Sequence, residues 1–379
     1  MKNIPFGKPV IDPKVIPKIK EILNSGQLVH GVYQKNFEEI FKKQNNSAYV
    51  TTVTNCTSGM FLYYMSKKLK KGDEVIVPAT THVATAHAIE ATGAKPVFVD
   101  VNIENGSINL DQAKKKINSK TRGLVVVHYL GFPINIEQLS YFRKKGLFIV
   151  EDCALAIGSS YNNIKVGNFG DCASFSFYPV KHITTGEGGM IILKNKKDFL
   201  NILSLKSFGY FHKKGLKKTR YNYDVKDCGL NFRLNEISCC IGESQLKDFS
   251  KIKKIRNRNF KLMKKKFLNI PEVSFMDEKN KKYNPNYYAF SVTLNNKNKD
   301  YRNKFIQKLK NVGIGASVYY PKPLPEMDYY KKKYNIKEKF SNSKIISYNS
   351  FVLPIGQHIN QNDIEYIYQN FKKIIYETK

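Results

Sequence analysis

Residues 172–193 read CASFSFYPVKHITTGEGGMIIL, two apolar runs on either side of a turn that holds one lysine and three glycines. Continuous apolar runs of this length are typical of strands that helices cover on both faces of a parallel sheet. Five similar runs lie toward the N-terminus, with helix-like stretches between them, at 48–53, 74–77, 96–99, 123–127 and 147–150. The pattern predicts an α/β fold built on one large sheet of seven mostly parallel strands.

The pattern changes after about residue 250, which indicates a second domain. The chain has 379 residues, more than one hydrophobic core usually holds. We therefore expect a large domain over 1–250, with an N-terminal arm that contains a helix at 13–24, and a smaller α+β domain over 251–379. The elements expected in the smaller domain are helices at 251–266, 300–311 and 362–376 and strands at 287–294 and 314–319.

The charge of the chain is strongly positive, with 63 Lys and Arg against 31 Asp and Glu and a formal net charge of +32. Such a charge is typical either of a protein that binds nucleic acid or a membrane surface, or of a surface on which lysine is used widely. Lysine is spread along the whole chain and known nucleic-acid modules are absent, so we favour the second interpretation. A positive field would still attract a substrate that carries a diphosphate.

Membrane insertion and a metal centre are both disfavoured by the sequence. No apolar run approaches the length that spans a bilayer, and the start MKNIPF lacks the apolar core of a signal peptide. The six cysteines form no CxxC pair and show no metal-ligand spacing. We expect a cytoplasmic protein without a metal, in a reducing compartment.

Polar residues follow the first and fifth apolar runs, at the strand ends where ligands bind in such sheets. The first run continues into TNCTSG (54–59) and a helix-like stretch, and a helix N-terminus with the hydroxyls of Thr57 and Ser58 favours a phosphate. Ser and Thr are also ordinary helix caps. Asp152 follows the fifth run, where it can pair with a protonated ring nitrogen or cap a helix.

Lys181 is the third polar residue at a strand end. Burial lowers the pKa of a lysine and frees its amine to form a Schiff base. The glycines that follow would let the backbone approach a bulky ligand. A structural lysine is the alternative, but a lysine, a carboxylate and a phosphate turn at one edge of a sheet favour a catalytic site for pyridoxal phosphate (PLP).

The chain resembles the DegT/DnrJ/EryC1/StrS family of sugar aminotransferases, which are PLP enzymes of fold type I. The resemblance runs from IPFGKP (4–9) almost to the C-terminus and is most specific at SFSFYPVKHITTGEGGM (174–190). It implies that Lys181 binds PLP covalently, that Asp152 pairs with the pyridine nitrogen, and that Ser176 and the turn of Cys56, Thr57 and Ser58 bind the phosphate. It also implies that Asn231 reaches the phosphate of a neighbouring subunit, hence a homodimer with shared active sites.

Three positions depart from the family pattern. Cys56 replaces a frequent Gly, and Leu155 replaces a Gln or His that contacts the ring hydroxyl of the cofactor. His82 stands where relatives place an aromatic residue that stacks on the cofactor ring, and imidazole can stack with less area. Tyr319 and Tyr320 resemble a motif near the sugar, although strand packing explains them as well.

The resemblance implies an aminotransferase that converts a nucleotide-linked keto-sugar to an amino sugar for polysaccharide or glycan biosynthesis. Glutamate is the expected amino donor, and the TTGEGG turn resembles members that act at C4 of the hexose. One alternative is a sugar dehydratase of the same family, in which His replaces the lysine, and here His182 stands beside Lys181. The other is a non-catalytic regulatory or binding protein that keeps the fold.

Overall fold

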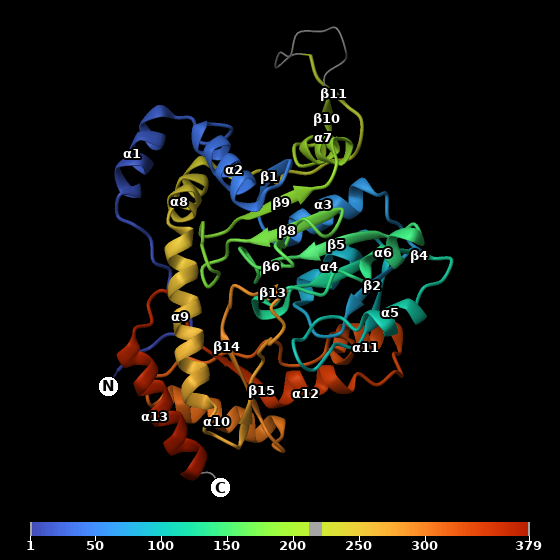
Figure 1. Cartoon of the computed structure of the whole chain (residues 1–379). Helices are drawn as coiled ribbons and strands as arrows, with labels where there is room; N and C mark the ends of the chain where they lie inside the picture. The colour runs from blue at the N-terminus through green and yellow to red at the C-terminus, as the bar shows by residue number, and fades with distance from the viewer. Residues whose placement is uncertain (1, 212–221, 378–379) are drawn as a thin grey trace.

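The computed structural model of the chain describes residues 2–211 and 222–377 (Figure 1). Its helices are α1 (Val15–Ser25), α2 (Val32–Asn45), α3 (Cys56–Ser66), α4 (Val83–Glu90), α5 (Leu110–Lys115), α6 (Leu139–Lys144), α7 (Lys196–Leu205), α8 (Glu236–Lys247), α9 (Phe249–Phe267), α10 (Lys299–Asn311), α11 (Asp328–Tyr334), α12 (Ser341–Asn349) and α13 (Gln361–Glu377), with 3-10 turns η1 (Tyr129–Gly131) and η2 (Leu324–Glu326). Its strands are β1 (Tyr49–Val53), β2 (Glu74–Pro78), β3 (Lys95–Val99), β4 (Thr121–Val127), β5 (Phe148–Asp152), β6 (Ser160–Tyr161), β7 (Ile164–Lys165), β8 (Cys172–Ser176), β9 (Gly189–Leu193), β10 (Tyr210–Phe211), β11 (Asp224–Val225), β12 (Val273–Ser274), β13 (Tyr283–Asn284), β14 (Phe290–Leu294) and β15 (Ser350–Leu353).

The seven predicted strands form one sheet in the order β1-β9-β8-β5-β4-β2-β3. Strand β9 runs antiparallel to its neighbours β1 and β8, and the other pairs are parallel. The register brings the strand ends to one edge, because Asp152 pairs with Ser174 and Val127, while Gly189 pairs with Ser176 and Val53. The predicted α/β fold with a mostly parallel sheet is confirmed.

Helices cover both faces of this sheet, as the continuous apolar strands predict. Side chains alternate along each strand, so Ile149 packs into a core with α2, α6 and α8, and Val150 packs into a core with α3, α4 and α7. Helix α2 was not expected from the sequence, yet its Phe37 and Phe41 are fully buried in the first of these cores. The sheet is therefore a rigid platform for the residues at its carboxyl edge.

A second core is built on the three-stranded sheet β12-β14-β15, against which α9, α10 and α13 pack (Figure 1). Helix α9 joins the two cores, since Phe249 and Ile252 pack with the large sheet while Phe260 and Met263 belong to the second core. We propose the boundary between 1–250 and 251–379 at this point. Ile4 also packs in the second core, so the start of the arm lies with the smaller domain.

The strand expected at 314–319 is wrong. Ile314 and Ser317 form isolated bridges, to Ile4 and Val352 respectively, in place of a continuous ladder. The bridges have different partners because the N-terminal arm passes beside one end of this segment and β15 beside the other. The helices expected at 13–24, 251–266, 300–311 and 362–376 are present within a few residues as α1, α9, α10 and α13.

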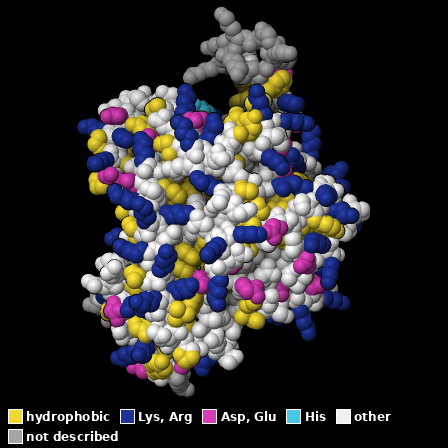
Figure 2. All heavy atoms as spheres, viewed as in Figure 1, with side chains coloured by type: hydrophobic (Ala, Val, Ile, Leu, Met, Phe, Trp, Pro, Cys, Tyr) yellow, Lys and Arg dark blue, Asp and Glu magenta, His cyan; other side chains and the backbone are white. Residues whose placement is uncertain are grey.

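Lysine and arginine side chains are scattered over the face seen in Figure 2, with Asp and Glu between them. This distribution agrees with lysine used widely on the surface rather than gathered on one element. Within 2–211 and 222–377, no helix is long and apolar enough to cross a membrane.

Candidate active site

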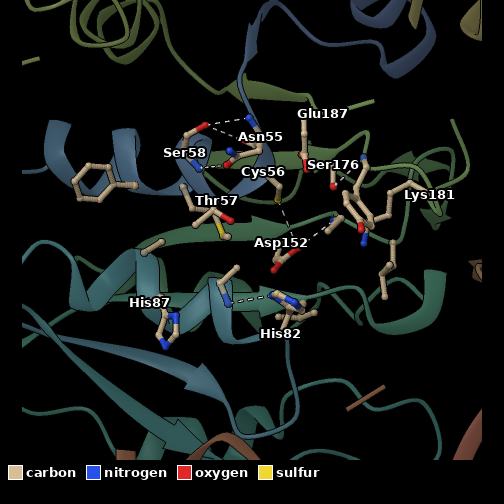
Figure 3. A pocket seen from close by; sticks show the side chains of 18 of the residues that line it. Asn55, Cys56, Thr57, Ser58, His82, His87, Asp152, Ser176, Lys181 and Glu187 are labelled. Carbon is tan, nitrogen blue, oxygen red and sulfur yellow. Dashed lines mark hydrogen bonds between the residues drawn. The ribbon is translucent and has the colours of Figure 1, made fainter. Parts of the chain in front are cut away.

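A cavity of about 700 Å³ lies at the carboxyl edge of the large sheet (Figure 3). Its wall contains eight of the residues singled out in the sequence: Cys56, Thr57, Ser58, His82, Asp152, Ser176, Lys181 and Tyr320. Leu155, which departs from the family pattern, lines it as well. These residues come from five segments of the chain, which the strand register brings together.

One wall of the cavity is the N-terminus of α3. The Asn55 side chain accepts a hydrogen bond from Ser58 N at 2.8 Å, and Ser58 Oγ in turn lies 3.2 Å from Asn55 N, which is a capping box. The N–H groups of Cys56 and Thr57 have no acceptor within the helix and are free for an anion. The Ser58 hydroxyl donates to Asn55 O at 2.7 Å, so it serves the cap and not the cavity.

The glycine-rich turn supports this wall from behind. A Cβ at Gly189 would lie 2.6 Å from the backbone carbon of Asn55, so only glycine lets β9 pass this close to the α3 cap. The sequence prediction placed the glycines against a ligand. Gly189 instead packs against the backbone that forms the phosphate-type turn, and Glu187 is the residue of this turn that reaches the cavity.

Asp152 ends β5 and lines the cavity with a nearly buried carboxylate. Its Oδ2 accepts a hydrogen bond from Thr85 Oγ1 at 2.7 Å, and its Oδ1 accepts one from Ala154 N at 3.0 Å. Cys56 Sγ lies 4.0 Å from Oδ1, and its thiol donates to Ser174 O. Each oxygen thus keeps capacity for one more donor, such as a protonated ring nitrogen.

Lys181 lies in the loop after β8, opposite the α3 wall (Figure 3). Burial lowers the pKa of its amine, and the nearby Asp152 carboxylate acts in the opposite direction. A lowered pKa increases the fraction of the neutral, nucleophilic amine at neutral pH. His182 turns away, because its Nε2 donates to Asn286 O at 2.9 Å and it is absent from the cavity wall.

His82 caps α4 and forms the opposite side of the cavity from the α3 turn. Its Nδ1 accepts a hydrogen bond from Ala84 N at 3.2 Å, and partial burial lowers its pKa, which favours a neutral ring. The ring lies 5.5 Å from that of Tyr320, edge to face. The imidazole is therefore oriented by α4 and by Tyr320.

Two predicted residues lie outside this cavity. The Tyr319 hydroxyl bonds to the Tyr288 hydroxyl at 2.7 Å, so packing between tyrosines explains it. Asn231 is exposed, and its Oδ1 accepts a hydrogen bond from Arg233 Nε at 3.0 Å. Its neighbour Phe232 does line the cavity.

Sequence reasoning missed several residues of the cavity wall, among them Asn55, Phe61, His87, His128, Tyr178, Glu187 and Phe232. It also missed Thr85, the donor to Asp152. The segment TTHVAT (80–85) follows the second apolar run, so its position at a strand end was the available signal. The contact of Thr85 with Asp152 is seen only in the folded chain.

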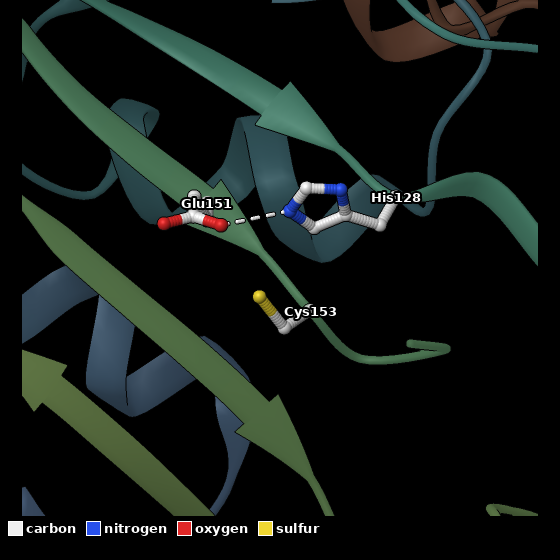
Figure 4. A group of neighbouring side chains, drawn as sticks. All are labelled: His128, Glu151 and Cys153. Atoms are coloured by element: carbon white, nitrogen blue, oxygen red, sulfur yellow. Dashed lines mark hydrogen bonds and ion pairs between the residues drawn. The ribbon is translucent and has the colours of Figure 1, made fainter. Parts of the chain in front are cut away.

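His128, Glu151 and Cys153 form a buried cluster beside the cavity (Figure 4). His128 Nε2 lies 2.9 Å from Glu151 Oε2, and His128 Nδ1 accepts from Ile134 N, so Nε2 is the donor. The Glu151 carboxylate also accepts from three backbone N–H groups, those of Gly167, Phe169 and Gly170. These bonds occupy the His128 and Glu151 atoms that would bind a metal and leave only Cys153 Sγ, so the cluster serves as a hydrogen-bonded brace.

The cavity fits a phosphorylated pyridine ring that carries an aldehyde. It offers free backbone donors for the phosphate at α3, a carboxylate for the ring nitrogen, and an amine with a lowered pKa for the aldehyde. Its volume of about 700 Å³ leaves space beside such a ring for a second molecule. The donor set therefore agrees with PLP.

Comparison with known proteins agrees with this geometry. The family model described as the DegT/DnrJ/EryC1/StrS aminotransferase family matches residues 9–372. The GDP-perosamine synthase of Escherichia coli O157:H7 is 32% identical, over 98% of this chain and 99% of the relative.

Among solved structures, Helicobacter pylori PseC, an aminotransferase involved in the biosynthesis of pseudoaminic acid, superposes with a TM-score of 0.92 at 27% identity, covering 99% of this chain and all of PseC. The aminotransferase TlmJ from Streptoalloteichus hindustanus gives a TM-score of 0.92 at 23% identity, with both chains fully covered, and shows the same fold. The predicted family is thus confirmed, and with it the cofactor. The chain belongs to the DegT/DnrJ/EryC1/StrS aminotransferase family, whose members use PLP.

Proposed function

We propose that this protein transfers an amino group from glutamate to the keto group of a nucleotide-linked sugar, at C4 of the hexose. The observation that carries the proposal is the single cavity that joins Lys181, Asp152 and the α3 N-terminus. The nucleotide in the name of the GDP-perosamine synthase relative supports this substrate class. The choice of C4 rests on the TTGEGG turn at 184–189.

Four elements of the chain would hold the cofactor. The backbone N–H groups of Cys56 and Thr57, together with the Ser176 hydroxyl, bind the phosphate. Asp152 holds a proton at the pyridine nitrogen through a charge-assisted hydrogen bond. His82 would contact the ring from the N-terminus of α4, and Lys181 Nζ would bond covalently to the aldehyde carbon with loss of water.

When bound, PLP supplies an electron sink that stabilises negative charge at the Cα of the amino donor. Once the amine of the donor has replaced Lys181 on the aldehyde carbon, the released Nζ would be the base for the reaction, because burial lowers its pKa and favours the neutral amine. It takes the proton from the donor Cα and later delivers a proton to the sugar carbon that receives nitrogen. Tyr320 lines the same cavity, which supports its proposed contact with the sugar. Tyr319 lies outside the cavity, so the proposed sugar contact rests on Tyr320.

The dehydratase alternative requires a histidine where Lys181 stands. His182 does not take that place, because its ring is buried against Asn286 and lies away from the cavity. The non-catalytic alternative gives no reason for a lysine with a lowered pKa beside a buried carboxylate. Both observations favour transamination.

We further propose a homodimer in which Asn231 serves the active site of the partner subunit. Exposed apolar side chains gather in the segments next to Asn231, at Phe208, Tyr210, Tyr223, Val225 and Leu230, and the rings of Phe208, Tyr210 and Tyr223 contact one another. Contiguous exposed apolar residues are typical of protein interfaces. We also propose a cytoplasmic location, since all six cysteines are free thiols, as in a reducing compartment.

A panel of nucleotide-linked keto-sugars tests the substrate class. The purified protein is incubated with PLP, glutamate and either a 4-keto or a 3-keto sugar, linked to GDP, UDP or dTDP, and amino-sugar formation is measured by mass spectrometry. We expect product with a 4-keto sugar. Product only from 3-keto sugars would contradict the C4 assignment. A protein that reacts with glutamate but aminates none of the nucleotide-linked sugars would contradict the substrate class.

Mixing two inactive variants tests the shared site. Lys181→Ala and Asn231→Ala homodimers are each expected to be nearly inactive. A heterodimer contains one site with an intact Lys181 and a partner's intact Asn231, so mixing after reversible dissociation should restore activity at about one site per heterodimer. Activity that stays absent in the mixture, or an Asn231→Ala enzyme with full activity, would contradict a shared site.

A further inference from the structure

The carboxylate of Asp152 is held by a residue from a distant part of the chain. Thr85 Oγ1 donates to Asp152 Oδ2 at 2.7 Å, across 67 residues of sequence. Thr85 lies in the first turn of α4 and its residue is fully buried. Asp152 Oδ1 is fixed separately, by Ala154 N at 3.0 Å.

A second threonine sets the direction of this hydrogen bond. Thr81 Oγ1 lies 2.8 Å from Thr85 Oγ1, and both residues are buried. A hydroxyl has one proton to donate, and the Asp152 carboxylate only accepts. The proton of Thr85 therefore points to Asp152, and Thr81 must donate to Thr85. The chain of donors runs from Thr81 through Thr85 to Asp152.

From this contact we infer that Thr85 is a positioning residue for the reaction, acting through Asp152. The inference rests on the proposed function, in which Asp152 holds a proton at the pyridine nitrogen. With one bond from the protein on each oxygen, the carboxylate has a fixed rotation, and its remaining lone pairs are those available to the cofactor.

Among the described residues, no other side chain near Asp152 duplicates this contact. Cys56 Sγ lies 4.0 Å from Oδ1, and its thiol proton is directed to Ser174 O at 3.4 Å. Without the Thr85 hydroxyl, one oxygen of Asp152 loses the bond that fixes its rotation. The hydrogen bond from the carboxylate to the pyridine nitrogen is then poorly aligned, and the nitrogen keeps less of its proton, which is the measurable consequence.

Three variants isolate the hydroxyl. Thr85→Val keeps the shape and removes the donor, while Thr85→Ser keeps the donor and removes a methyl group. Thr80→Val is the matched control, because Thr80 is equally buried in the same segment and its hydroxyl has no hydrogen-bond partner within the described part of the chain. Each protein is loaded with PLP carrying ¹⁵N in the ring, and the ¹⁵N chemical shift is recorded against pH.

We expect the ¹⁵N signal of Thr85→Val to move toward that of an unprotonated pyridine, with Thr85→Ser and Thr80→Val close to wild type. The rate of the half-reaction with glutamate should fall about tenfold to a hundredfold in Thr85→Val alone, the range for losing a hydrogen bond to a charged group. A wild-type ¹⁵N shift in Thr85→Val, or equal effects in Thr85→Ser, would overturn the inference.

Asp152→Asn separates this inference from the proposed function. If Asp152→Asn changes the ¹⁵N shift while Thr85→Val does not, Asp152 acts as proposed and the role of Thr85 is wrong. If Asp152→Asn also keeps the wild-type shift, the pairing of Asp152 with the cofactor is wrong, and the role of Thr85 falls with it. Thr81→Val, which leaves the donor to Asp152 in place, is expected to give a smaller change than Thr85→Val.

Discussion

Replacing Glu151 with Gln tests the buried brace beside the active site. The Glu151 side chain is fully buried and has four donors, two on each oxygen. Glutamine keeps the shape of the side chain but presents an NH₂ group on one end. The substitution therefore asks whether the carboxylate, and not only the volume it fills, supports this part of the fold.

The cost follows from the two possible orientations of the amide. If the NH₂ group replaces Oε1, the N–H groups of Phe169 and Gly170 lose their acceptor. If the NH₂ group replaces Oε2, the Gly167 N–H and the His128 Nε2–H lose their acceptor. Moving the His128 proton to Nδ1 would free Nε2 to accept from the new amide, but Ile134 N–H would then lose its acceptor, Nδ1. Two buried donors are unpaired in either case, at about 1–3 kcal/mol each, so unfolding should become easier by about 2–6 kcal/mol.

Urea unfolding of the PLP-free protein, followed by far-ultraviolet circular dichroism, measures this change. Tyrosine fluorescence is a second probe, since the chain has 24 Tyr and no Trp. Glu39→Gln is the control, because Glu39 is 56% exposed in an ion pair with Lys42 and such pairs contribute little. A free energy of unfolding for Glu151→Gln within about 1 kcal/mol of the control would refute the reasoning.

Three further predictions concern the site and its surroundings. In Gly59→Ala the new Cβ would lie 2.4 Å from Ser174 Oγ, the atom that donates to Cys56 O in the phosphate turn. PLP affinity, measured by fluorescence titration, should therefore fall about tenfold. The double variant Gly59→Ala/Ser174→Ala removes the clash and should recover the affinity. Burial lowers the pKa of His182 well below 6.5, so only the unfolded chain gains its proton as the pH falls. Stability should then decrease by about 1.4 kcal/mol per pH unit below 6.5, and His182→Gln should reduce this dependence in urea melts at pH 7.5 and 5.5, whereas equal slopes would count against it. Dialysis against EDTA should change neither PLP uptake nor the unfolding midpoint, because the bonds of Glu151 and His128 leave only Cys153 Sγ of this cluster for a metal. A loss of PLP uptake or a lower midpoint would contradict this.

The large sheet could be predicted from the sequence because its strands are continuous apolar runs. Strand ends then located Asp152 and Lys181, since side chains at the carboxyl edge of such a sheet face the ligand site. The predicted strand at 314–319 failed because apolar content alone does not show which partner a segment pairs with. Ile314 and Ser317 pair with two different segments, which depends on the path of the N-terminal arm.

Within the site, the sequence identified residue types but not their hydrogen bonds. The Ser58 hydroxyl was expected to face the phosphate, but the Asn55 cap uses it, and this competition is decided by local backbone geometry. The contact between Thr85 and Asp152 depends on how α4 packs beside β5. A contact of this kind has no signature in a single sequence, whereas the strand end that carries Asp152 does.

The visible absorption spectrum of the PLP-loaded protein tests the central claim most directly. It is recorded before and after glutamate is added, for the wild type and for Lys181→Ala. The account predicts a lysine-bound cofactor band in the wild type that glutamate converts to the band of pyridoxamine phosphate, and no such lysine-bound band in the variant. A wild type that takes up no PLP, or a band that responds neither to glutamate nor to the loss of Lys181, would contradict it.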